Sequence, residues 1–418
     1  MRFIEPGRID GMLEAPSSKS EFQRITAAAA LAAGRSEVLF HNLCDDSLAA
    51  LRAARGLGAL ISRTANGISI EGGQERHGNV LDCGESGLCL RMFAPLAALF
   101  SHEVTLTGRG SLLRRPVAML EDSLRQAGVA CRSRDGFPPF TVRGPLAGGG
   151  VRVDGGVTSQ AVTGLLMALP LAKEDSRLTV VNLTSRPYLE LTLSVVAQSG
   201  IVVESHFEDG RFLIPGGQRY HPRSWTVEGD WSGTSFLLVA GAIAGRVLVK
   251  NLNINSWQAD KAVLKALEQC GAAVAIQSDA HTHHAEVRQA QLAAFEFDAA
   301  DCPDLFPPLA ALACYCRGTS IITGVHRLRH KESDRAAALI DVLGTIGAKL
   351  GVKGDALHIT GSKVSGGRVD SHGDHRIAMS AAVVALGSER GVEILGPECV
   401  AKSYPRFFED LELLKEKS

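Results

Sequence analysis

The sequence lacks an excess of charge of either sign, and it lacks long apolar runs. The 418 residues carry a net charge of −1 at pH 7. A large nucleic-acid or membrane surface normally leaves a basic excess, so we expect neither partner. No stretch of about 18 uncharged apolar residues occurs, so no membrane span is predicted. The N-terminal MRFIEPGRIDG has neither the apolar core of a signal peptide nor an Arg- and Ser-rich transit character, and we expect a cytoplasmic protein.

Paired cysteines and cofactor motifs are also missing. The nine cysteines include no C-x-x-C pair, and the close pair Cys314 and Cys316 lies in an apolar run. We therefore expect reduced, mostly buried thiols. The chain contains no P-loop, no dinucleotide-binding fingerprint and no H-E-x-x-H motif. The run HTHH at 281–284 is more typical of a solvated polar loop than of a metal site. No metal and no cofactor are predicted.

The most informative feature that is present is an internal repeat. Six short β-branched segments predict strands, and each follows an Ala-rich apolar segment that predicts a helix. Successive strands are separated by 66, 74, 69, 74 and 71 residues. The residues that mark them are Val38, Val104, Leu178, Val247, Ile321 and Val392.

A second helix is predicted after each of the first five strands. These helices end near Gly58, Gly128, Gly200, Gly271 and Gly347, which suit left-handed C-caps. The Ala-rich helices carry small residues on all faces, as helices packed inside a core do. A unit of roughly 70 residues is too small to bury its own helix. We therefore predict an α/β fold of two similar domains, each with three repeated β/α/β units, buried helices and outer sheets. The boundary is expected near residues 223–229, and the first strand, near residues 2–11, could pair with either half.

Hydroxyl, glycine and basic residues recur at the predicted helix starts. One such segment holds Lys19, Ser20 and Arg24, with Ser20 as the expected N-cap. An ordinary capped helix would explain any one segment. Several such segments together favour helix starts that converge on a binding site for a small, highly anionic ligand. The other segments contain Gly87 and Arg91, Thr158 to Gln160, Lys331 to Arg335, and Asp374 to Arg376.

Acidic residues are embedded among these bases. Asp304 precedes an apolar helix, where a carboxylate is commonly a cap. Glu332 lies between Lys331 and Arg335 and could form a simple ion pair. In a site shielded from water, both acids could instead be tuned for proton transfer.

Seven segments, in order along essentially the whole chain, resemble the 5-enolpyruvylshikimate-3-phosphate synthases. They are APSSKSEFQR, VTSQAVTGLLMALPL, SRPY, PDLFPPLAALA, KESDR, GDHR and AKSYP. The resemblance implies an inside-out α/β barrel type of fold, with residues 1–13 and 227–418 in one domain and 14–226 in the other. It implies ligands in a closing cleft between the domains. The implied reaction transfers the enolpyruvyl group of phosphoenolpyruvate to the 5-hydroxyl of shikimate 3-phosphate and releases phosphate, in a monomer without metal or cofactor.

The resemblance also assigns roles to residues. Asp304 is the expected acceptor of the hydroxyl proton, and Glu332 with Lys19 is expected to move protons at C3 of phosphoenolpyruvate. The implied contacts to shikimate 3-phosphate are Lys19, Ser20, Arg24, Thr158, Ser159, Gln160, Ser185, Tyr188, Asp304 and Lys331. The implied contacts to phosphoenolpyruvate are Lys19, Gly87, Arg115, Gln160, Arg335, Arg376 and Lys402. Arg suits such anions because its planar fork binds carboxylate or phosphate in a bidentate manner.

The chain departs from the family at one motif. The family's usual N-A-G-T-A-x-R-P is E-S-G-L-C-L-R-M here, from Glu85 to Met92, with Gly87 retained. Because Leu88 and Met92 reshape this helix, we expect weaker binding of glyphosate, an inhibitor of the family. In GRGSLLRRP either Arg114 or Arg115 could supply the guanidinium, and we choose Arg115 because it precedes Pro116 directly.

Two alternative functions stay open. The sister enolpyruvyl transferase that acts on UDP-N-acetylglucosamine shares the fold, but it typically carries a reactive loop cysteine that GRGSLLRRP lacks. Cys83 and Cys89 lie nearby, and we expect both to be buried and structural. A non-catalytic, anion-binding repeat protein would keep the bases and lose the acids, whereas Asp304, Glu332 and Asp374 are all present.

Overall fold

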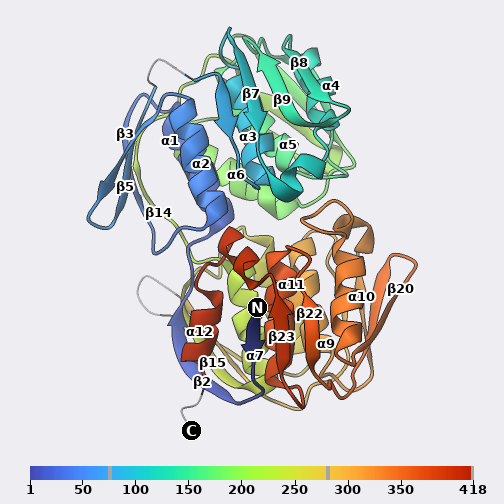
Figure 1. Ribbon diagram of the computed structural model, residues 1–418. Coiled ribbons are helices and arrows are strands. Elements are labelled where there is room, and N and C mark those ends of the chain that lie inside the picture. Colours follow the sequence, from blue (N-terminus) through green and yellow to red (C-terminus); the bar gives the residue numbers. More distant parts are fainter. Residues whose placement is uncertain (74–77, 279–282, 416–418) are drawn as a thin grey trace. The chain divides into compact units, whose positions relative to one another are not determined.

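The computed structural model describes residues 1–73, 78–278 and 283–415 (Figure 1). The chain separates into two compact units. We call Lys19–Val227 the continuous unit, and Met1–Ser18 together with Glu228–Ser418 the split unit.

The continuous unit repeats one order of elements three times: a buried helix, a strand, a second helix and a hairpin. Its described helices are α1 (Lys19–Leu31), α2 (Asp45–Gly56), α3 (Gly87–Ala97), α4 (Ala118–Gln126), α5 (Gln160–Ala168) and α6 (Arg186–Gln198). Its described strands are β3 (Gly34–Leu39), β4 (Leu60–Thr64), β5 (Gly67–Gly72), β6 (Val80–Asp82), β7 (Glu103–Thr107), β8 (Ala130–Arg134), β9 (Phe137–Arg143), β10 (Gly149–Asp154), β11 (Ser176–Val181), β12 (Glu204–His206), β13 (Arg211–Ile214) and β14 (Ser224–Thr226). A further strand, β6 or β10, precedes the second and third repeats. The sheets have the orders β14-β3-β5-β4, β6-β7-β9-β8 and β10-β11-β13-β12.

The split unit follows the same plan. Its described helices are α7 (Trp231–Ala244), α8 (Val263–Gln269), α9 (Phe306–Ala313), α10 (Arg335–Thr345), α11 (His375–Leu386) and α12 (Phe407–Leu413). Its described strands are β1 (Arg2–Ile4), β2 (Ile9–Glu14), β15 (Gly245–Leu252), β16 (Ala273–Ser278), β17 (His283–Arg288), β18 (Glu296–Asp298), β19 (Thr319–Thr323), β20 (Lys349–Lys353), β21 (Ala356–Thr360), β22 (Gly367–Asp370) and β23 (Val392–Leu395). The sheets have the orders β16-β17-β15-β2, β18-β19-β21-β20 and β1-β23-β22.

Two strands are exchanged between the repeats. β2 precedes α1 in the sequence, yet it pairs in parallel with β15 of the split unit. β14 precedes α7, yet it pairs in parallel with β3 of the continuous unit. β1 pairs antiparallel with β23 and takes the place of a hairpin in the last repeat. The single N-terminal strand of the prediction is therefore two strands, and both lie in the split unit.

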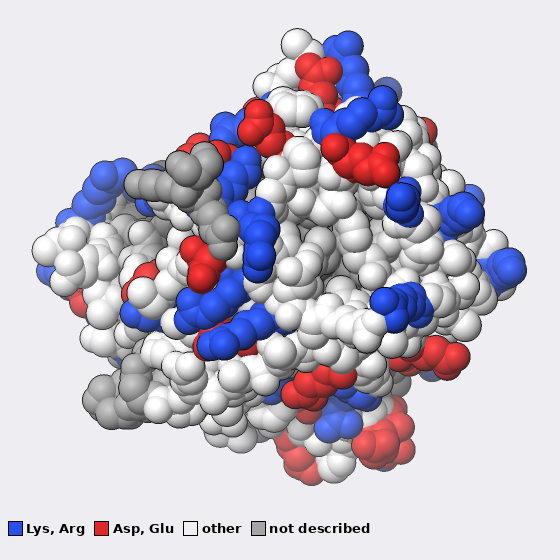
Figure 2. All heavy atoms as spheres, turned by 90° about the horizontal axis from the view of Figure 1, so that it is seen from below, with Lys and Arg blue, Asp and Glu red and all other residues white. Residues whose placement is uncertain are grey.

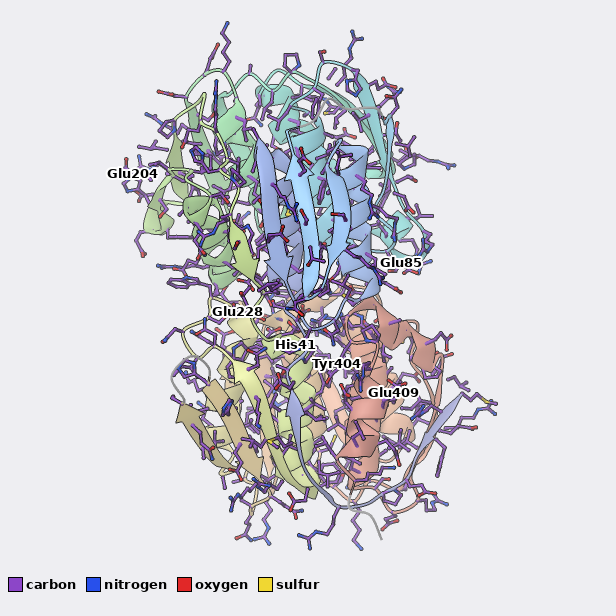
Figure 3. All side chains as sticks on the ribbon, turned by 90° about the vertical axis from the view of Figure 1, so that its left-hand side faces the viewer. His41, Glu85, Glu204, Glu228, Tyr404 and Glu409 are labelled. Atoms are coloured by element: carbon purple, nitrogen blue, oxygen red, sulfur yellow. The ribbon has the colours of Figure 1, made fainter. Side chains whose placement is uncertain are left out.

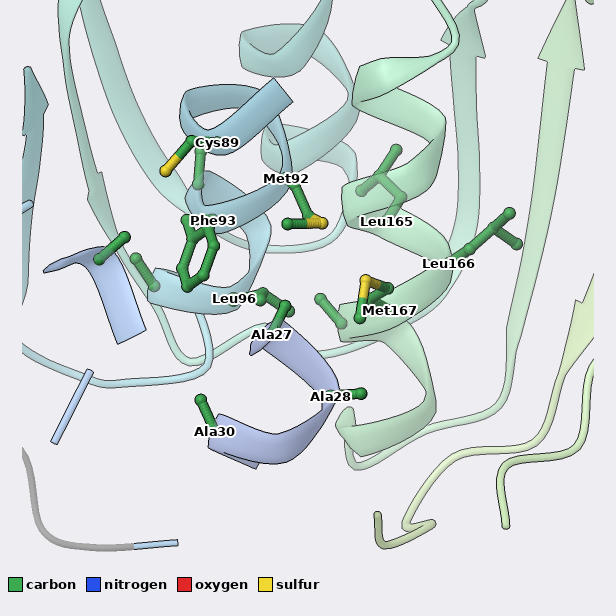
Figure 4. Close-up of a cluster of buried hydrophobic side chains, with 14 of the residues drawn as sticks. Ala27, Ala28, Ala30, Cys89, Met92, Phe93, Leu96, Leu165, Leu166 and Met167 are labelled. Atoms are coloured by element: carbon green, nitrogen blue, oxygen red, sulfur yellow. The ribbon is translucent and has the colours of Figure 1, made fainter. Parts of the chain in front are cut away.

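The helices between strands form the core of each unit. Every residue of α3, α7, α9 and α11 is buried. In the continuous unit, Ala27 of α1, Met92 of α3 and Leu165 of α5 gather in one apolar cluster (Figure 4). A Cβ on Gly164 would lie 2.6 Å from the Arg91 carbonyl oxygen, so α3 and α5 approach closely only because this residue is glycine. The prediction of buried, small-residue helices is confirmed.

The predicted helix ends are confirmed as well. Gly58, Gly128, Gly200, Gly271 and Gly347 follow α2, α4, α6, α8 and α10 with φ between +81° and +102°. In this conformation glycine avoids the steric penalty of a Cβ, so it ends the helix at low cost. The last repeat also contains a closing helix, α12, which the sequence did not predict. The Tyr404 hydroxyl, labelled in Figure 3, donates to Asp410 of α12 at 2.8 Å, and the Tyr404 and Phe407 rings lie 5.7 Å apart.

Seven of the nine cysteines are buried and Cys131 and Cys399 are partly buried, which confirms the prediction of mostly buried thiols. In residues 1–73, 78–278 and 283–415, no helix combines the length and apolarity that crossing a membrane requires. On the face drawn in Figure 2, positive and negative side chains are interspersed with uncharged ones.

The run HTHH was wrongly predicted to be wholly a loop. His283 and His284 begin β17, where His283 pairs with Ser278 of β16. His281 and Thr282 lie outside the described residues. The strand forms because its neighbours provide a register that the polar sequence does not reveal.

Candidate active site

In the split unit, the starts of three buried helices are linked by one guanidinium group. Arg376 is the second residue of α11, and its Nη2 donates to the Ser232 hydroxyl near the start of α7. The same Nη2 lies 3.0 Å from Oδ2 of Asp304, just before α9. Helix N-termini carry unpaired N–H groups and partial positive charge. Their convergence therefore makes this end of the unit suitable for binding anions.

Asp304 is held by three cations. Its Oδ1 accepts hydrogen bonds from Lys331 at 3.3 Å and from Arg335 at 2.8 Å, in addition to the Arg376 contact of its Oδ2. Burial alone would raise the pKa of this carboxyl group. The positive charges of Arg376, Lys331 and Arg335 outweigh that effect and hold the pKa well below its usual range. Asp304 is thus the centre of an ion cluster and is ionised at neutral pH.

Arg335 lies completely buried among three carboxylates. Its Nη2 donates to Glu332 at 2.6 Å and its Nε donates to Asp374 at 3.0 Å. Its Nη1 donates to Asp304 at 2.8 Å. Burial would lower the pKa of this guanidinium, but the three acids raise it overall. Lys402 approaches Glu332 at 3.9 Å. The acids of this cluster therefore neutralise most of its positive charge.

Two further groups in the cluster have perturbed or fixed proton states. Burial lowers the pKa of Lys331 to about 8, although Asp304 opposes this. His375 Nε2 lies 3.0 Å from Arg376 Nη1. Because a guanidinium only donates, this nitrogen of His375 must be the acceptor and carries no proton.

Sequence reasoning missed two residues of this cluster. Ser232 lies in DWSGT, a hydroxyl and glycine turn like those at the other helix starts, and the repeat could have identified it. Asp260 is fully buried, and burial followed by the negative charge of Asp304 raises its pKa to about 6, partly offset by Arg376. Its segment SWQAD resembles an ordinary turn before a helix and carries no distinguishing signal.

The continuous unit has its own set of helix starts. Lys19 is the first residue of α1, and its Nζ forms an ion pair with Asp46 of α2 at 3.1 Å. The prediction that Ser20 is the N-cap is wrong, because α1 begins one residue earlier and Ser20 lies in its first turn. The Ser86 hydroxyl at the start of α3 donates to Gln23 of α1 at 3.1 Å, so these two starts are neighbours.

Arg24 is buried within α1 and is largely used by its own unit. Its Nε donates to Thr192 at 2.9 Å and its Nη1 donates to the Ser20 carbonyl at 2.7 Å. Its Nη2 donates to Thr163 at 3.3 Å and to the Tyr188 carbonyl at 3.2 Å. Burial lowers the pKa of Arg24 to about 10, against the opposing effect of Tyr188. Four of five N–H donors are engaged, which leaves one for a ligand.

The guanidinium of Arg115 lies against the start of α3. A Cβ on Gly87 would lie 2.7 Å from Cζ of Arg115, so the glycine makes room for this side chain. Arg115 is 6% exposed, whereas Arg114 is exposed. Glu85, labelled in Figure 3, accepts from the backbone N–H and the hydroxyl of Ser111 at 3.2 and 3.1 Å. The loop before Arg115 is thereby tied to the segment before α3.

The predicted residues near α5 and α6 surround two further helix starts. Gln160 is the first residue of α5, and its backbone N–H donates to the Thr158 hydroxyl at 3.2 Å. Ser159 and Ser185 are buried beside these starts. Ser185 adopts a left-handed conformation with φ +53°, which is strained for a residue with a Cβ. Such strain at a helix start is common at ligand-binding positions.

The described residues contain no group of three or more His, Cys, Asp and Glu side chains placed to hold a metal ion.

The predicted site residues fall into two clusters, one in each unit. Asp304, Lys331, Glu332, Arg335, Arg376 and Lys402 lie in the split unit, and Lys19, Ser20, Arg24, Gly87, Arg115, Thr158, Ser159, Gln160, Ser185 and Tyr188 lie in the continuous unit.

Comparisons with known proteins agree over nearly the full length. Residues 4–411 match the family model of EPSP synthase (3-phosphoshikimate 1-carboxyvinyltransferase). A 3-phosphoshikimate 1-carboxyvinyltransferase of Methanocorpusculum labreanum is 38% identical over 98% of this chain and 97% of its own. One of Clostridium kluyveri is 36% identical over 98% and 96%. A solved EPSP synthase of Acinetobacter baumannii superposes with a TM-score of 0.84 at 26% identity, over 99% of this chain and 97% of its own.

Proposed function

The chain belongs to the EPSP synthase family, and from this premise we propose that it transfers the enolpyruvyl group of phosphoenolpyruvate to the 5-hydroxyl of shikimate 3-phosphate. The products are 5-enolpyruvylshikimate 3-phosphate and phosphate, in the shikimate pathway toward aromatic amino acids. The observation that carries the proposal is Asp304, an ionised carboxylate in contact with three cations at an end of the unit suited to anions.

The substrate contacts are proposed from the same residues. Residues 14–226 would bind shikimate 3-phosphate through hydroxyl, amide and basic groups. Residues 1–13 and 227–418 would supply the acid–base groups and much of the phosphoenolpyruvate site. The buried position of Arg115 against Gly87 supports its assignment over Arg114. The arginine and lysine side chains at the helix starts of both units support binding of two substrates that repel each other.

The proposed chemistry is an addition followed by an elimination. The 5-hydroxyl oxygen attacks C2 of phosphoenolpyruvate while C3 takes up a proton. The resulting tetrahedral ketal phosphate then loses phosphate from C2 and a proton from C3. One C–O bond forms and one breaks, and no covalent enzyme intermediate is required.

Asp304 is the proposed acceptor of the hydroxyl proton. A carboxylate held by three cations is a weak base, because those charges lower its pKa. Substrate phosphate and carboxylate groups that pair with Arg335, Arg376 or Lys331 would weaken this effect. Binding of both substrates would therefore raise the pKa of Asp304 at the moment when a base is needed.

Glu332, with Lys19, is proposed to move the proton at C3. Glu332 is nearly buried and contacts Arg335 and Lys402, which fix its position. Lys19 is fixed by Asp46. A side chain that gives a proton to C3 must be held close to that carbon, and ion pairs that immobilise the side chain satisfy this need.

The test is phosphate release from phosphoenolpyruvate by the full chain. Release should require shikimate 3-phosphate and should be accompanied by one enolpyruvyl ether per phosphate. UDP-N-acetylglucosamine in its place should give none. Release that depends on UDP-N-acetylglucosamine would instead assign the chain to the sister reaction. Binding of both substrates without any turnover would point to an anion-binding protein. A cytoplasmic location and a monomeric state remain proposals, to be tested by fractionation and by light scattering.

A further inference from the structure

Arg91 is a buried guanidinium that joins three segments of the continuous unit. It lies in the second turn of α3 and is 2% exposed. Its Nη1 donates to Oε1 of Gln160 at 2.7 Å. Its Nε and Nη2 donate to the carbonyl oxygen of Pro116 at 3.2 and 2.8 Å. Arg91 therefore links α3 to the first residue of α5 and to the residue that follows Arg115.

We infer that Arg91 is a positioning residue that fixes the Gln160 amide so that its NH2 group is presented to substrate oxygens. A guanidinium has only donors, so the amide oxygen of Gln160 must face it. The NH2 group then faces away from Arg91, and within the described residues no hydrogen-bond partner takes it. Gln160 is thereby restricted to donating, and its complementary ligand group is an oxygen of a phosphate, a carboxylate or a hydroxyl.

Packing alone does not explain a guanidinium at this position. Contact between α3 and α5 is already provided by Gly164, whose missing Cβ lets the Arg91 and Met92 backbone approach. Removing an arginine side chain from water is costly, and an apolar residue of similar size would fill the position with less penalty. The gain from Arg91 is the fixed orientation of Gln160, because a side chain that is already fixed loses less conformational entropy when substrate binds.

The inference deepens the proposed function and rests on it. The test is a double-mutant cycle on the full chain with Arg91→Met, Gln160→Met and the double variant. The quantities measured are KM for each substrate and kcat. In the wild-type background, Arg91→Met should lower kcat/KM about tenfold or more, mainly through KM, as expected when a hydrogen bond to a charged group is lost. In the Gln160→Met background, the same change should cost about tenfold less, because the amide is no longer there to be oriented.

A second variant tests the direction of the amide. Gln160→Glu keeps an oxygen for Arg91 and forms an ion pair with it, so the thermal unfolding midpoint should be unchanged or raised. It replaces the two N–H donors by a negatively charged oxygen, so KM for the anionic substrates should rise more than tenfold. A midpoint that falls together with unchanged KM values would overturn the inference.

The controls separate this inference from the proposed function. Arg132→Met removes an exposed arginine whose guanidinium pairs with the exposed side chain of Glu103, and it should leave kcat and KM unchanged. If Arg91→Met does not fold, Arg91→Lys completes the same cycle, since one ammonium group cannot serve both Gln160 and Pro116. Equal effects of the Arg91 change in both backgrounds would refute the positioning role. An inactive wild-type enzyme would refute the proposed function instead.

Discussion

At the residue scale, the charged side chains at the candidate site of the split unit form ion pairs with one another. Asp304 contacts Lys331, Arg335 and Arg376, and Arg335 contacts Asp304, Glu332 and Asp374. Pairing keeps buried ions from carrying an uncompensated desolvation cost. It also means that an incoming anion must compete with Asp304 for its cations. Substrate binding and the basicity of Asp304 are therefore coupled through the same three contacts.

The variant Asp304→Asn tests whether the negative charge of Asp304 is needed for catalysis. Asp304→Asn keeps the side-chain size but cannot accept a proton, so kcat should fall by about 100-fold or more. KM for phosphoenolpyruvate should fall or stay constant, because the cations lose a competing carboxylate. Phosphate release measured at saturating substrates gives kcat, and circular dichroism verifies the fold. The matched control is Asp355→Asn at the exposed His326 pair, which should retain wild-type turnover. A kcat near wild type for Asp304→Asn would remove its role as the base.

Lys331 gives the enzyme an expected alkaline limit. Burial lowers the pKa of this ammonium group to about 8, so the free enzyme loses this positive charge as the pH rises through that value. Below pH 8 the group is charged and can bind an anion. The profile of kcat/KM for shikimate 3-phosphate should therefore fall on the alkaline side with an apparent pKa near 8. The profile of kcat alone should fall at higher pH, because a bound anion stabilises the ammonium form.

The variant Lys331→Arg tests whether this residue sets the limit. A guanidinium stays charged across the accessible range, so the alkaline fall of kcat/KM should move upward by more than one pH unit. If the alkaline fall of kcat/KM stays near pH 8 in this variant, a group other than Lys331 titrates there.

At the element scale, the starts of the buried helices carry the chemistry, and α3 shows how closely they are fitted. Arg115 packs onto Gly87, Glu85 ties the preceding segment to Ser111, and Arg91 reaches α5 from the next turn. Changes at the start of this helix are therefore expected to alter ligand binding before they alter stability.

Gly87→Ala should displace Arg115 from the start of α3. The added Cβ would lie 2.7 Å from the guanidinium carbon, so the side chain has to move. We expect KM for phosphoenolpyruvate to rise about tenfold, since a charge-assisted contact is lost. Steady-state kinetics with varied phosphoenolpyruvate measures this. Gly344→Ala is the control, because nothing lies within 4 Å of the added Cβ and alanine favours α10. Equal KM values in both variants would contradict the assignment of Arg115.

Glyphosate binding should be weaker here than in a family member with the usual N-A-G-T-A-x-R-P motif. Leu88 is larger than Thr, and Met92 is fully buried against α5, so the start of α3 is held differently. Glu85 adds a negative charge where the usual motif has an uncharged Asn. The inhibition constant against phosphoenolpyruvate should be higher for this chain under matched conditions. It should fall in Glu85→Asn and Leu88→Thr together. An unchanged constant in that variant would locate the cause elsewhere.

The elements show why sequence reasoning succeeded in some places and failed in others. The six strands and five closing glycines were predicted, because an apolar repeat and a left-handed C-cap are local signals. The hairpin strands were not predicted. Two of them, β12 and β16, are almost wholly exposed and bury no alternate residues that would mark a strand. The site residues came from motifs. The contacts between them were not predicted. Arg91 and Gln160 are 69 residues apart, and Arg376 and Ser232 are 144 apart, so only packing brings each pair together.

At the scale of the whole chain, the order of elements in sequence differs from their order in the sheets. The continuous unit contains every strand of its own sheets, because β14 at its end pairs with β3. The split unit depends on residues 1–18, which supply β2 to the edge of β15 and β1 to the edge of β23. Ile4 and Ile9 from this segment are each 1% exposed. The two units should therefore differ in their ability to fold when the chain is cut at their boundaries.

The fragment 19–227 should fold by itself, whereas 228–418 should not. The first retains its sheets and its buried helices. The second loses two strands, which exposes the backbone edges of β15 and β23 and removes two isoleucines from the core. Thermal unfolding followed by circular dichroism should be cooperative for 19–227 and featureless for 228–418. Attaching residues 1–18 after residue 418 through a flexible linker should restore a cooperative transition. The two segments are already neighbours, because the backbone N–H of Asp10 donates to the carbonyl oxygen of Leu414 at 2.9 Å. An equally cooperative transition for 228–418 without that segment would show that the exchanged strands are dispensable for the split unit.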